Sequence, residues 1–328
     1  MPRFNSGINI SRRTWLKQGA AVGATAVLAV SSDGVALAAQ PAAERKRVLR
    51  LAHLTDVHVQ PELAAEQGLV ACLHHAQSLS DPPQLLLTGG DMVMDVMGND
   101  AARAKAQADI WRRALRNECS LPVRSCIGNH DVWGWNKKGS KTRGDEPLWG
   151  KSWAEDLLGL TKRYYSFDEA GWRFIALDST FPDGSSYTAK LDEGQFDWLK
   201  KTLEATSRST PVLVFSHIPI LSAAAFLDGE SEKSGNWRVP GAWMHIDVRR
   251  IKDLFLKHPQ VKLCLSGHLH LVDQVLYNGV TYCCNGAVCG SWWEGDNQEC
   301  DEGYGVVELF SDGSFENRYV GFGWQPRV

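Results

Sequence analysis

The amino-acid sequence predicts an α/β protein in which two β-sheets pack together and helices cover their outer faces. Apolar segments of strand length alternate with amphipathic segments of helix length along the first part of the chain after residue 48. The C-terminal part carries mainly strand signals, and this order of elements is typical of layered sheets covered by helices. With 328 residues, 44% of them hydrophobic, the chain is long enough for one large domain.

The first half of the fold is predicted as strand, helix, strand, helix and strand. Alternating apolar residues predict a buried strand at 48–54, and a proline opens the helical periodicity of 61–79. The apolar run 85–87 fits a buried strand, and the Asn-Asp pair at 99–100 offers a good N-cap for the helix that follows. Residues 123–127, which lead into the Gly-Asn-His turn, are predicted to form the third strand.

Two long irregular segments separate the elements of the second half. Residues 133–153 and 222–244 read as loops, and long loops in compact domains are often functional. Asn278-Gly279, between two alternating segments, is a strong signal for a type I′ hairpin. The remaining predicted elements are strands at 164–167, 173–177, 212–215, 261–265, 304–309 and 315–320, and helices around 195–203 and from Asp247.

The N-terminal residues carry three features of an export signal in order. Residues 11–17, Ser-Arg-Arg-Thr-Trp-Leu-Lys, resemble the twin-arginine signal, a weakly apolar stretch follows at 19–30, and small residues suited to cleavage occur at 36–38. The alternative, an N-terminal helix of the fold, does not explain this order. We therefore expect a signal peptide at 1–38, a linker at 39–47 and one folded domain, which carries the function, at 48–328.

These features predict a periplasmic or secreted protein whose partner during export is the twin-arginine machinery. The apolar stretch is too short, and too rich in Gly and Ala, to span a bilayer stably. No cysteine follows that stretch to carry a lipid, so we expect no membrane anchor in the mature chain. The net charge of −3 provides no broad basic field, and nucleic-acid polymers are not expected as partners.

The eight cysteines do not form a recognisable redox or zinc motif. None of them stands in a C-x-x-C pair, which argues against a zinc ribbon or a thioredoxin-like motif. An exported location permits disulfides, whereas folding in a reducing compartment before export does not favour them. The sequence leaves open whether any of the eight form disulfides.

Five short polar motifs stand where predicted strands end. In chain order they are Asp56-Val57-His58, Gly90-Asp91, Gly128-Asn129-His130-Asp131, His217 and Gly267-His268-Leu269-His270. Together they supply seven oxygen or nitrogen donors, which is enough for two metal ions if one carboxylate is shared. Two such ions can clamp a phosphoryl group in line with an attacking hydroxide.

The spacing of these residues suits metal binding. Asp56 and His58 are two residues apart where a strand runs out, so both side chains can reach one ion. Asp91 follows two glycines, and the absence of Cβ atoms lets that turn bring its carboxylate close to both ions. His268 and His270 alternate along a short turn, so each can face a different ion.

The set resembles the calcineurin-like metallophosphoesterase superfamily, whose pattern is D-x-H, G-D, G-N-H-D/E, H and G-H-x-H. Within it, the set is most similar to the class III cyclic nucleotide phosphodiesterases, over residues 48–270. The resemblance implies a four-layer α/β/β/α sandwich of two mixed β-sheets flanked by helices, with metal ions at the strand ends. It also implies a metal-dependent phosphoric ester hydrolase, either a phosphodiesterase or a phosphatase, acting on small-molecule phosphodiesters and also on monoesters.

The resemblance implies roles for individual residues. One metal ion would be held by Asp56, His58, Asp91 and His270, and the other by Asp91, Asn129, His217 and His268. Mixed carboxylate and imidazole ligands suit divalent or trivalent Mn, Fe, Zn or Co. A hydroxide that bridges the ions would attack phosphorus, and His130 would protonate the leaving oxygen or bind phosphate.

Other interpretations fit these residues less well. A catalytically weak module that only binds a phosphorylated ligand should lack a metal ligand or His130, yet all are present. Ser/Thr protein phosphatases carry an Asp three residues after the shared Asp, where this chain has Met94, and Asp95 comes one residue later. For the tryptophans near the motifs, such as Trp292 and Trp293, packing of loops is favoured over a stacking platform for a substrate ring.

Overall fold

The computed structural model of the protein describes residues 45–326. The predicted signal peptide, its cleavage site and most of the predicted linker lie outside these residues. Within residues 45–326, no helix has both the length and the apolar character that a bilayer span requires.

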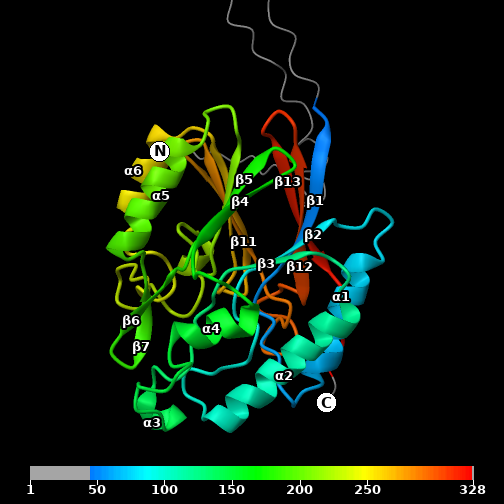
Figure 1. The fold of residues 1–328 in the computed structure, drawn as a ribbon, viewed down its shortest axis with the longest axis vertical. Coiled ribbons are helices and arrows are strands. Elements are labelled where there is room, and N and C mark those ends of the chain that lie inside the picture. Colours follow the sequence, from blue (N-terminus) through cyan, green and yellow to red (C-terminus); the bar gives the residue numbers. More distant parts are fainter. Residues whose placement is uncertain (1–44, 327–328) are drawn as a thin grey trace, which may run out of the picture. The chain divides into compact units, whose positions relative to one another are not determined.

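A five-stranded mixed sheet forms one of the two central layers (Figure 1). Its strand order is β13-β12-β1-β2-β3. The strands β1 (Arg47–Leu54), β2 (Leu85–Thr88) and β3 (Val123–Ser125) are parallel. The antiparallel strands β12 (Gly303–Phe310) and β13 (Phe315–Gly321) complete the edge beside β1. The C-terminal strands therefore belong to the same sheet as the first strand of the fold.

A six-stranded mixed sheet forms the second central layer, in the order β10-β11-β9-β8-β5-β4. Its strands are β4 (Tyr165–Glu169), β5 (Trp172–Ala176), β8 (Val212–Phe215), β9 (Val261–Ser266), β10 (Val272–Tyr277) and β11 (Val280–Asn285). The inner four are parallel, and β4 and β10 are antiparallel at the edges. The hairpin between β10 and β11 turns at Asn278 and Gly279, both with positive φ, as the sequence predicts.

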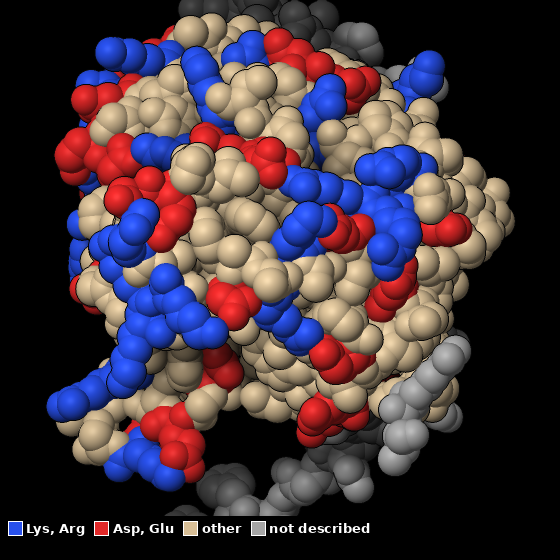
Figure 2. Space-filling view, turned by 60° about the horizontal axis from the view of Figure 1, so that its bottom comes forward, with Lys and Arg blue, Asp and Glu red and all other residues tan. Residues whose placement is uncertain are grey.

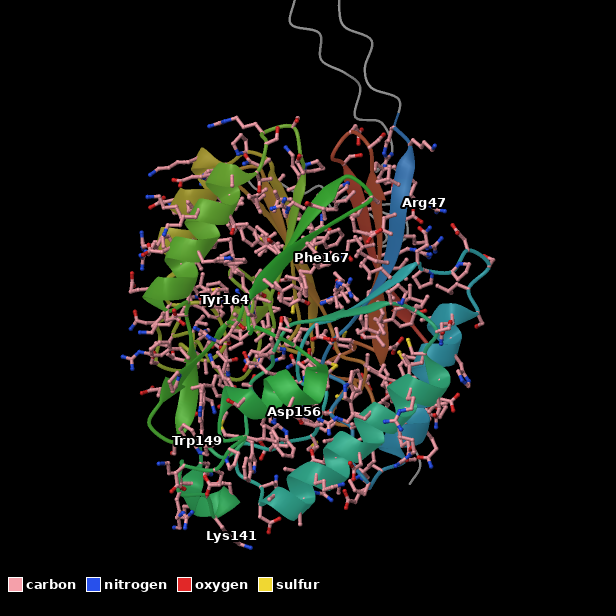
Figure 3. All side chains as sticks on the ribbon, viewed as in Figure 1. Arg47, Lys141, Trp149, Asp156, Tyr164 and Phe167 are labelled. Carbon is pink, nitrogen blue, oxygen red and sulfur yellow. The ribbon has the colours of Figure 1, made fainter. Side chains whose placement is uncertain are left out.

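Apolar side chains fill the space between the two sheets (Figure 3). Leu51 and Leu87 of the first sheet share this core with Phe174 and Phe215 of the second, and all four are fully buried. Phe167, labelled in Figure 3, stacks on Phe174 with ring centroids 4.8 Å apart. Parallel strands that are covered on both faces need apolar residues on both, which explains the continuous apolar runs in the sequence.

Helices cover the outer face of each sheet and complete four layers. The helices α1 (Ala65–Gln77) and α2 (Ala101–Glu118) pack on the first sheet, and α5 (Glu193–Ala205) and α6 (Val248–Lys257) pack on the second. Asp100 caps α2 by accepting a hydrogen bond from the backbone N–H of Arg103. The predicted α/β/β/α sandwich is confirmed.

Several local elements differ from the sequence prediction. The predicted loop 133–153 contains the short helix α3 (Lys137–Ser140) and the start of α4 (Lys151–Leu158), which has no side-chain cap to signal its start. A two-stranded sheet, β6 (Thr180–Asp183) with β7 (Ser186–Ala189), was not predicted. β6 contains a proline, which argues against a central strand but is tolerated in an isolated pair. The segment 222–244 is irregular as predicted, apart from the 3₁₀ turn η2 (Ala224–Phe226).

Candidate metal centre

The polar motifs follow the carboxyl ends of five parallel strands and meet in one place. Asp56 and His58 follow β1, Asp91 follows β2, Asn129 follows β3, His217 follows β8, and His268 and His270 follow β9. Six of these seven side chains are buried, and His268 is partly buried. The structure thus brings all seven predicted ligands together, at the edge where open α/β sheets bind ligands.

The first group of donors contains Asp56, His58 and His270. The Nε2 atoms of His58 and His270 are 3.2 Å apart. Oδ1 of Asp56 lies 3.4 Å from Nε2 of His270 and 3.8 Å from Nε2 of His58. Oδ2 of Asp91 is also 3.8 Å from Nε2 of His58. These four residues are the set that the sequence predicts for one ion.

The second group of donors surrounds Nε2 of His217. This atom lies 3.0 Å from Oδ1 of Asn129, 3.1 Å from Nδ1 of His268 and 3.0 Å from Oδ2 of Asp91. Oδ1 of Asp56 is further away, at 4.0 Å. Oδ2 of Asp91 therefore contacts the second group directly while facing the first, which is the position that a shared ligand needs.

The donor atoms fit cations. Oδ1 of Asp56 is buried and has no hydrogen-bond partner, and an unpaired buried carboxylate oxygen is costly without a nearby positive charge. Nδ1 of His217 donates to the carbonyl oxygen of Gly89 at 2.8 Å, and Nδ1 of His270 donates to that of Gly290 at 2.7 Å. These bonds direct the Nε2 lone pairs toward the other donors, as in metal sites of proteins.

Protonation of His217 competes with metal binding. Burial lowers the pKa of this imidazole, but the carboxylates of Asp91 and Asp56 more than offset burial and raise the pKa to about 9. The proton must leave before Nε2 can bind a metal ion, so acid opposes metal uptake.

The backbone at the centre is strained. Asp56, His58, Asp91, His268 and His270 all have positive φ angles, between 47° and 74°. Each non-glycine residue in this region costs about 1–3 kcal/mol, and such residues cluster at functional sites. Close approach of the loops adds a second constraint. A Cβ at Gly128 would lie 2.1 Å from the backbone nitrogen of Asp91, and one at Gly267 would lie 2.2 Å from Oδ2 of Asp56.

The carboxylate of Asp131 holds the Asp91 loop in this conformation. It accepts hydrogen bonds from the backbone N–H groups of Asp91 and Met92, both at 2.9 Å, and of Gly128 at 3.0 Å. Asp131 is fully buried, and because its hydrogen bonds are to backbone N–H groups, it orients the shared ligand through the backbone. The sequence motif contained Asp131, but only the structure shows this task.

His130 lies at the solvent-facing edge of the centre. Its Nε2 is 4.0 Å from Oδ2 of Asp91, its Nδ1 is 3.6 Å from Oδ1 of Asp95, and 27% of the side chain is exposed. Burial lowers the pKa of His130, but Asp91 and Asp95 more than offset this effect, so the pKa lies above its usual value. Asp95 therefore reaches this imidazole although it comes one residue later than the corresponding Asp of protein phosphatases.

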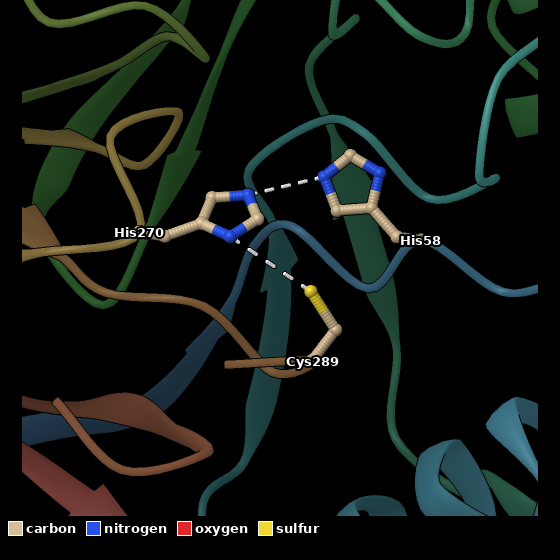
Figure 4. Close-up of side chains that lie close together, drawn as sticks. All are labelled: His58, His270 and Cys289. Carbon is tan, nitrogen blue, oxygen red and sulfur yellow. Dashed lines mark hydrogen bonds between the residues drawn. The ribbon is translucent and has the colours of Figure 1, made fainter. Parts of the chain in front are cut away.

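A segment near the C-terminus, which the sequence does not predict to be part of the site, forms one wall of the centre. The backbone N–H of Cys289 donates to the carbonyl oxygen of Asp56 at 3.1 Å, and the thiol of Cys289 lies 4.0 Å from Nδ1 of His270 (Figure 4). Among residues 45–326, three groups of possible metal ligands have their ligand atoms within 4.8 Å of one another. They are His58, His270 and Cys289; His58, Asp91 and His130; and Asp91, His217 and His268. No ligand spacing in the sequence pointed to Cys289.

Comparisons with known proteins agree with this geometry. A family model described as calcineurin-like phosphoesterase matches residues 49–272. A probable cyclic nucleotide phosphodiesterase from Synechococcus sp. is 28% identical over 82% of this chain and 91% of its own length. A 3′,5′-cyclic-nucleotide phosphodiesterase from Nostoc sp. is 24% identical over 83% of this chain and 92% of its own length. A dimetal phosphatase structure from Danio rerio shares the fold, with a TM-score of 0.52, 15% identity, and coverage of 85% of this chain and 100% of that one.

Replacing Asp91 should remove more metal than replacing any other single ligand. In Asp91→Ala both donor groups lose an oxygen, whereas His58→Ala and His217→Ala each weaken one group. Elemental analysis of the purified variants should show the lowest metal content for Asp91→Ala, and an unchanged content for Asp109→Ala, an exposed aspartate of α2. Equal losses in all three ligand variants would contradict a shared position for Asp91.

Proposed function

The chain belongs to the calcineurin-like phosphoesterase family, and we propose that it is an exported enzyme with two metal ions in its active site. Its substrates would be phosphodiesters, and also monoesters, of small molecules. As a member of this family it is a metal-dependent phosphoric ester hydrolase. The main support for the proposal is that Oδ2 of Asp91 lies close to both donor groups. It is 3.8 Å from Nε2 of His58 and 3.0 Å from Nε2 of His217.

The residues of the centre divide into two sets of metal ligands. One set would be Asp56, His58, Asp91 and His270, and the other Asp91, Asn129, His217 and His268. Imidazoles together with carboxylate and amide oxygens suit divalent or trivalent transition-metal ions, with Mn, Fe, Zn and Co as the candidates. When bound, two such ions would lower the pKa of a water nucleophile and neutralise the charge of the phosphoryl oxygens.

A side chain of the protein, that of His130, would donate the proton to the leaving oxygen. His130 faces the donors with Nε2 and contacts Asp95 with Nδ1, and part of its side chain is open to solvent. A substrate phosphate placed among the donors would bring its leaving oxygen within reach of this imidazole. Asp95 accepts hydrogen bonds from the backbone N–H groups of Met97 and Gly98, so its carboxylate is held 3.6 Å from Nδ1 of His130.

Small molecules suit this surface better than polyanions. Basic and acidic side chains are interspersed over the face shown in Figure 2. Along α2, ion pairs join Arg103 to Glu62, Arg112 to Asp156 and Arg113 to Glu66. Arginines that are paired in this way do not form a continuous track for a phosphate backbone, which supports a small phosphoester as the substrate.

Hydrolysis should depend on added transition metal. The purified mature protein, treated with a chelator, should hydrolyse bis(p-nitrophenyl) phosphate only after Mn, Fe, Zn or Co is restored, and should hydrolyse p-nitrophenyl phosphate under the same conditions. Asp91→Ala should stay inactive with every metal because it lacks the shared ligand. An absence of diester and monoester hydrolysis with all four metals would overturn the proposal.

Loss of His130 should affect poor leaving groups most. His130→Ala should keep near-normal metal content, because the seven other donors are intact. An alkyl leaving group needs a proton, whereas nitrophenolate departs with little help, so kcat should fall about 10²–10⁴-fold for an alkyl diester and much less for a nitrophenyl diester. Equal losses for both substrates would assign phosphate binding, and not proton donation, to His130.

Export should require both arginines of the signal. Residues 1–38 resemble a twin-arginine signal, and this route would deliver the folded protein to the periplasm or medium. Replacing Arg12 and Arg13 together by Lys should leave full-length precursor in the cytoplasm, as measured by cell fractionation. Normal export of the double variant would exclude the twin-arginine route.

A further inference from the structure

The indole of Trp292 lies against three imidazoles of the candidate metal centre. Its ring centroid is 4.2 Å from that of His58, 4.9 Å from that of His270 and 5.5 Å from that of His130. Trp292 is only partly buried, and His130 beside it reaches solvent. The indole therefore lies at the entrance of the centre, on the side of the first donor group.

The backbone holds Trp292 in this place at a cost. Trp292 and Trp293 have φ angles of 57° and 72°, a conformation that bulky residues rarely adopt. Such strain persists only where the surrounding structure imposes it, and it is concentrated at ligand-binding positions.

Trp293, and not Trp292, supplies the packing of this segment. Trp293 is fully buried, and its Nε1 donates to the carbonyl oxygen of His58 at 3.2 Å. The ring fits against α1 at Gly68, where a Cβ would lie 2.1 Å from Trp293 Cζ3. With the segment anchored in this way, Trp292 is left to face the entrance.

The segment also orients a metal ligand. The carbonyl oxygen of Gly290 accepts the hydrogen bond from Nδ1 of His270, and the N–H of Cys289 donates to Asp56. The position of Trp292 is thereby coupled to the donors. This segment lies beyond residues 49–272, which the family model matches, so the family pattern assigns it no role.

We propose that the indole of Trp292 forms one wall of a substrate-binding subsite. A planar aromatic ring of the phosphodiester, such as a nucleobase, would stack on it. The inference rests on the proposed function, because the phosphate must occupy the metal centre for its ring to reach the indole. Stacking of a base on an aromatic side chain is sequence-tolerant and strengthens binding by about 5–150-fold. The sequence favours loop packing for both tryptophans, whereas in the structure Trp293 is the buried one and Trp292 lies against the donor imidazoles.

A matched pair of substrates tests the subsite. Adenosine 3′,5′-cyclic phosphate and the 3′,5′-cyclic phosphate of methyl riboside share the phosphodiester and the leaving oxygen and differ in the base. The metal-loaded wild type should prefer the adenosine compound in kcat/KM by about 5–150-fold, mainly through KM. Trp292→Ala should bring the ratio close to one, and Trp292→Phe should retain most of the preference.

Controls separate the subsite from a structural effect. Trp237→Ala removes a tryptophan that is 58% exposed and should leave the ratio unchanged. Glycine adopts the positive φ of position 292 without strain, so Trp292→Gly should fold at least as stably as the wild type. It should nevertheless lose the preference for the adenosine compound. Metal content should equal that of the wild type in every tryptophan variant. A preference that survives in both Trp292→Ala and Trp292→Gly would overturn the inference.

A binding measurement distinguishes failure of this inference from failure of the proposed function. By calorimetry, the metal-loaded wild type should bind adenosine 5′-monophosphate more tightly than ribose 5-phosphate, and Trp292→Ala should bind both equally. This result would support the subsite even if neither cyclic compound were hydrolysed. If hydrolysis occurs but Tyr187→Ala, and not Trp292→Ala, removes the preference, the ring binds near His268, where Tyr187 lies with its ring centroid 6.1 Å away.

Discussion

The structure of the centre depends on two carboxylates, Asp56 and Asp91, that are buried where five strands end. A buried charge is tolerated only when opposite charge or hydrogen-bond donors surround it. Here the surrounding groups are imidazoles, and Oδ1 of Asp56 still has no hydrogen-bond partner. The centre therefore favours cations, and the family to which the chain belongs uses such cations to hydrolyse phosphoric esters.

The rest of the fold holds these carboxylates in unfavourable positions. Five of the seven predicted ligands have positive φ, and the loops that carry them approach so closely that Gly128 and Gly267 have no room for a side chain. The rigid element behind them is a pair of sheets with a fully buried core, and Asp131 ties the Asp91 loop to this framework. Strain at a functional site is sustained when the scaffold beneath it is rigid.

The C-terminal part of the chain contributes more than the completion of a sheet. The strands β12 and β13 join the sheet that begins with β1, which brings the preceding segment, 287–295, beside the Asp56 loop. Through Gly290 this segment orients His270, and through Trp292 it shapes the entrance. Metal binding and substrate selection would thus share one structural element. Changes in this segment should therefore alter both, unless they are confined to the partly exposed indole of Trp292.

The sequence alone predicted the layers of the fold and which polar side chains would converge. Local rules were sufficient for this, because buried parallel strands demand apolar runs, Asp100 caps its helix, and each polar motif follows a strand end. It did not reveal the hairpin of β6 and β7, the task of Asp131, or the separate roles of Trp292 and Trp293. These features depend on contacts between residues far apart in the chain, such as Trp293 with His58. These features follow from tertiary packing, because the same residue types in another arrangement would be ordinary core or loop residues.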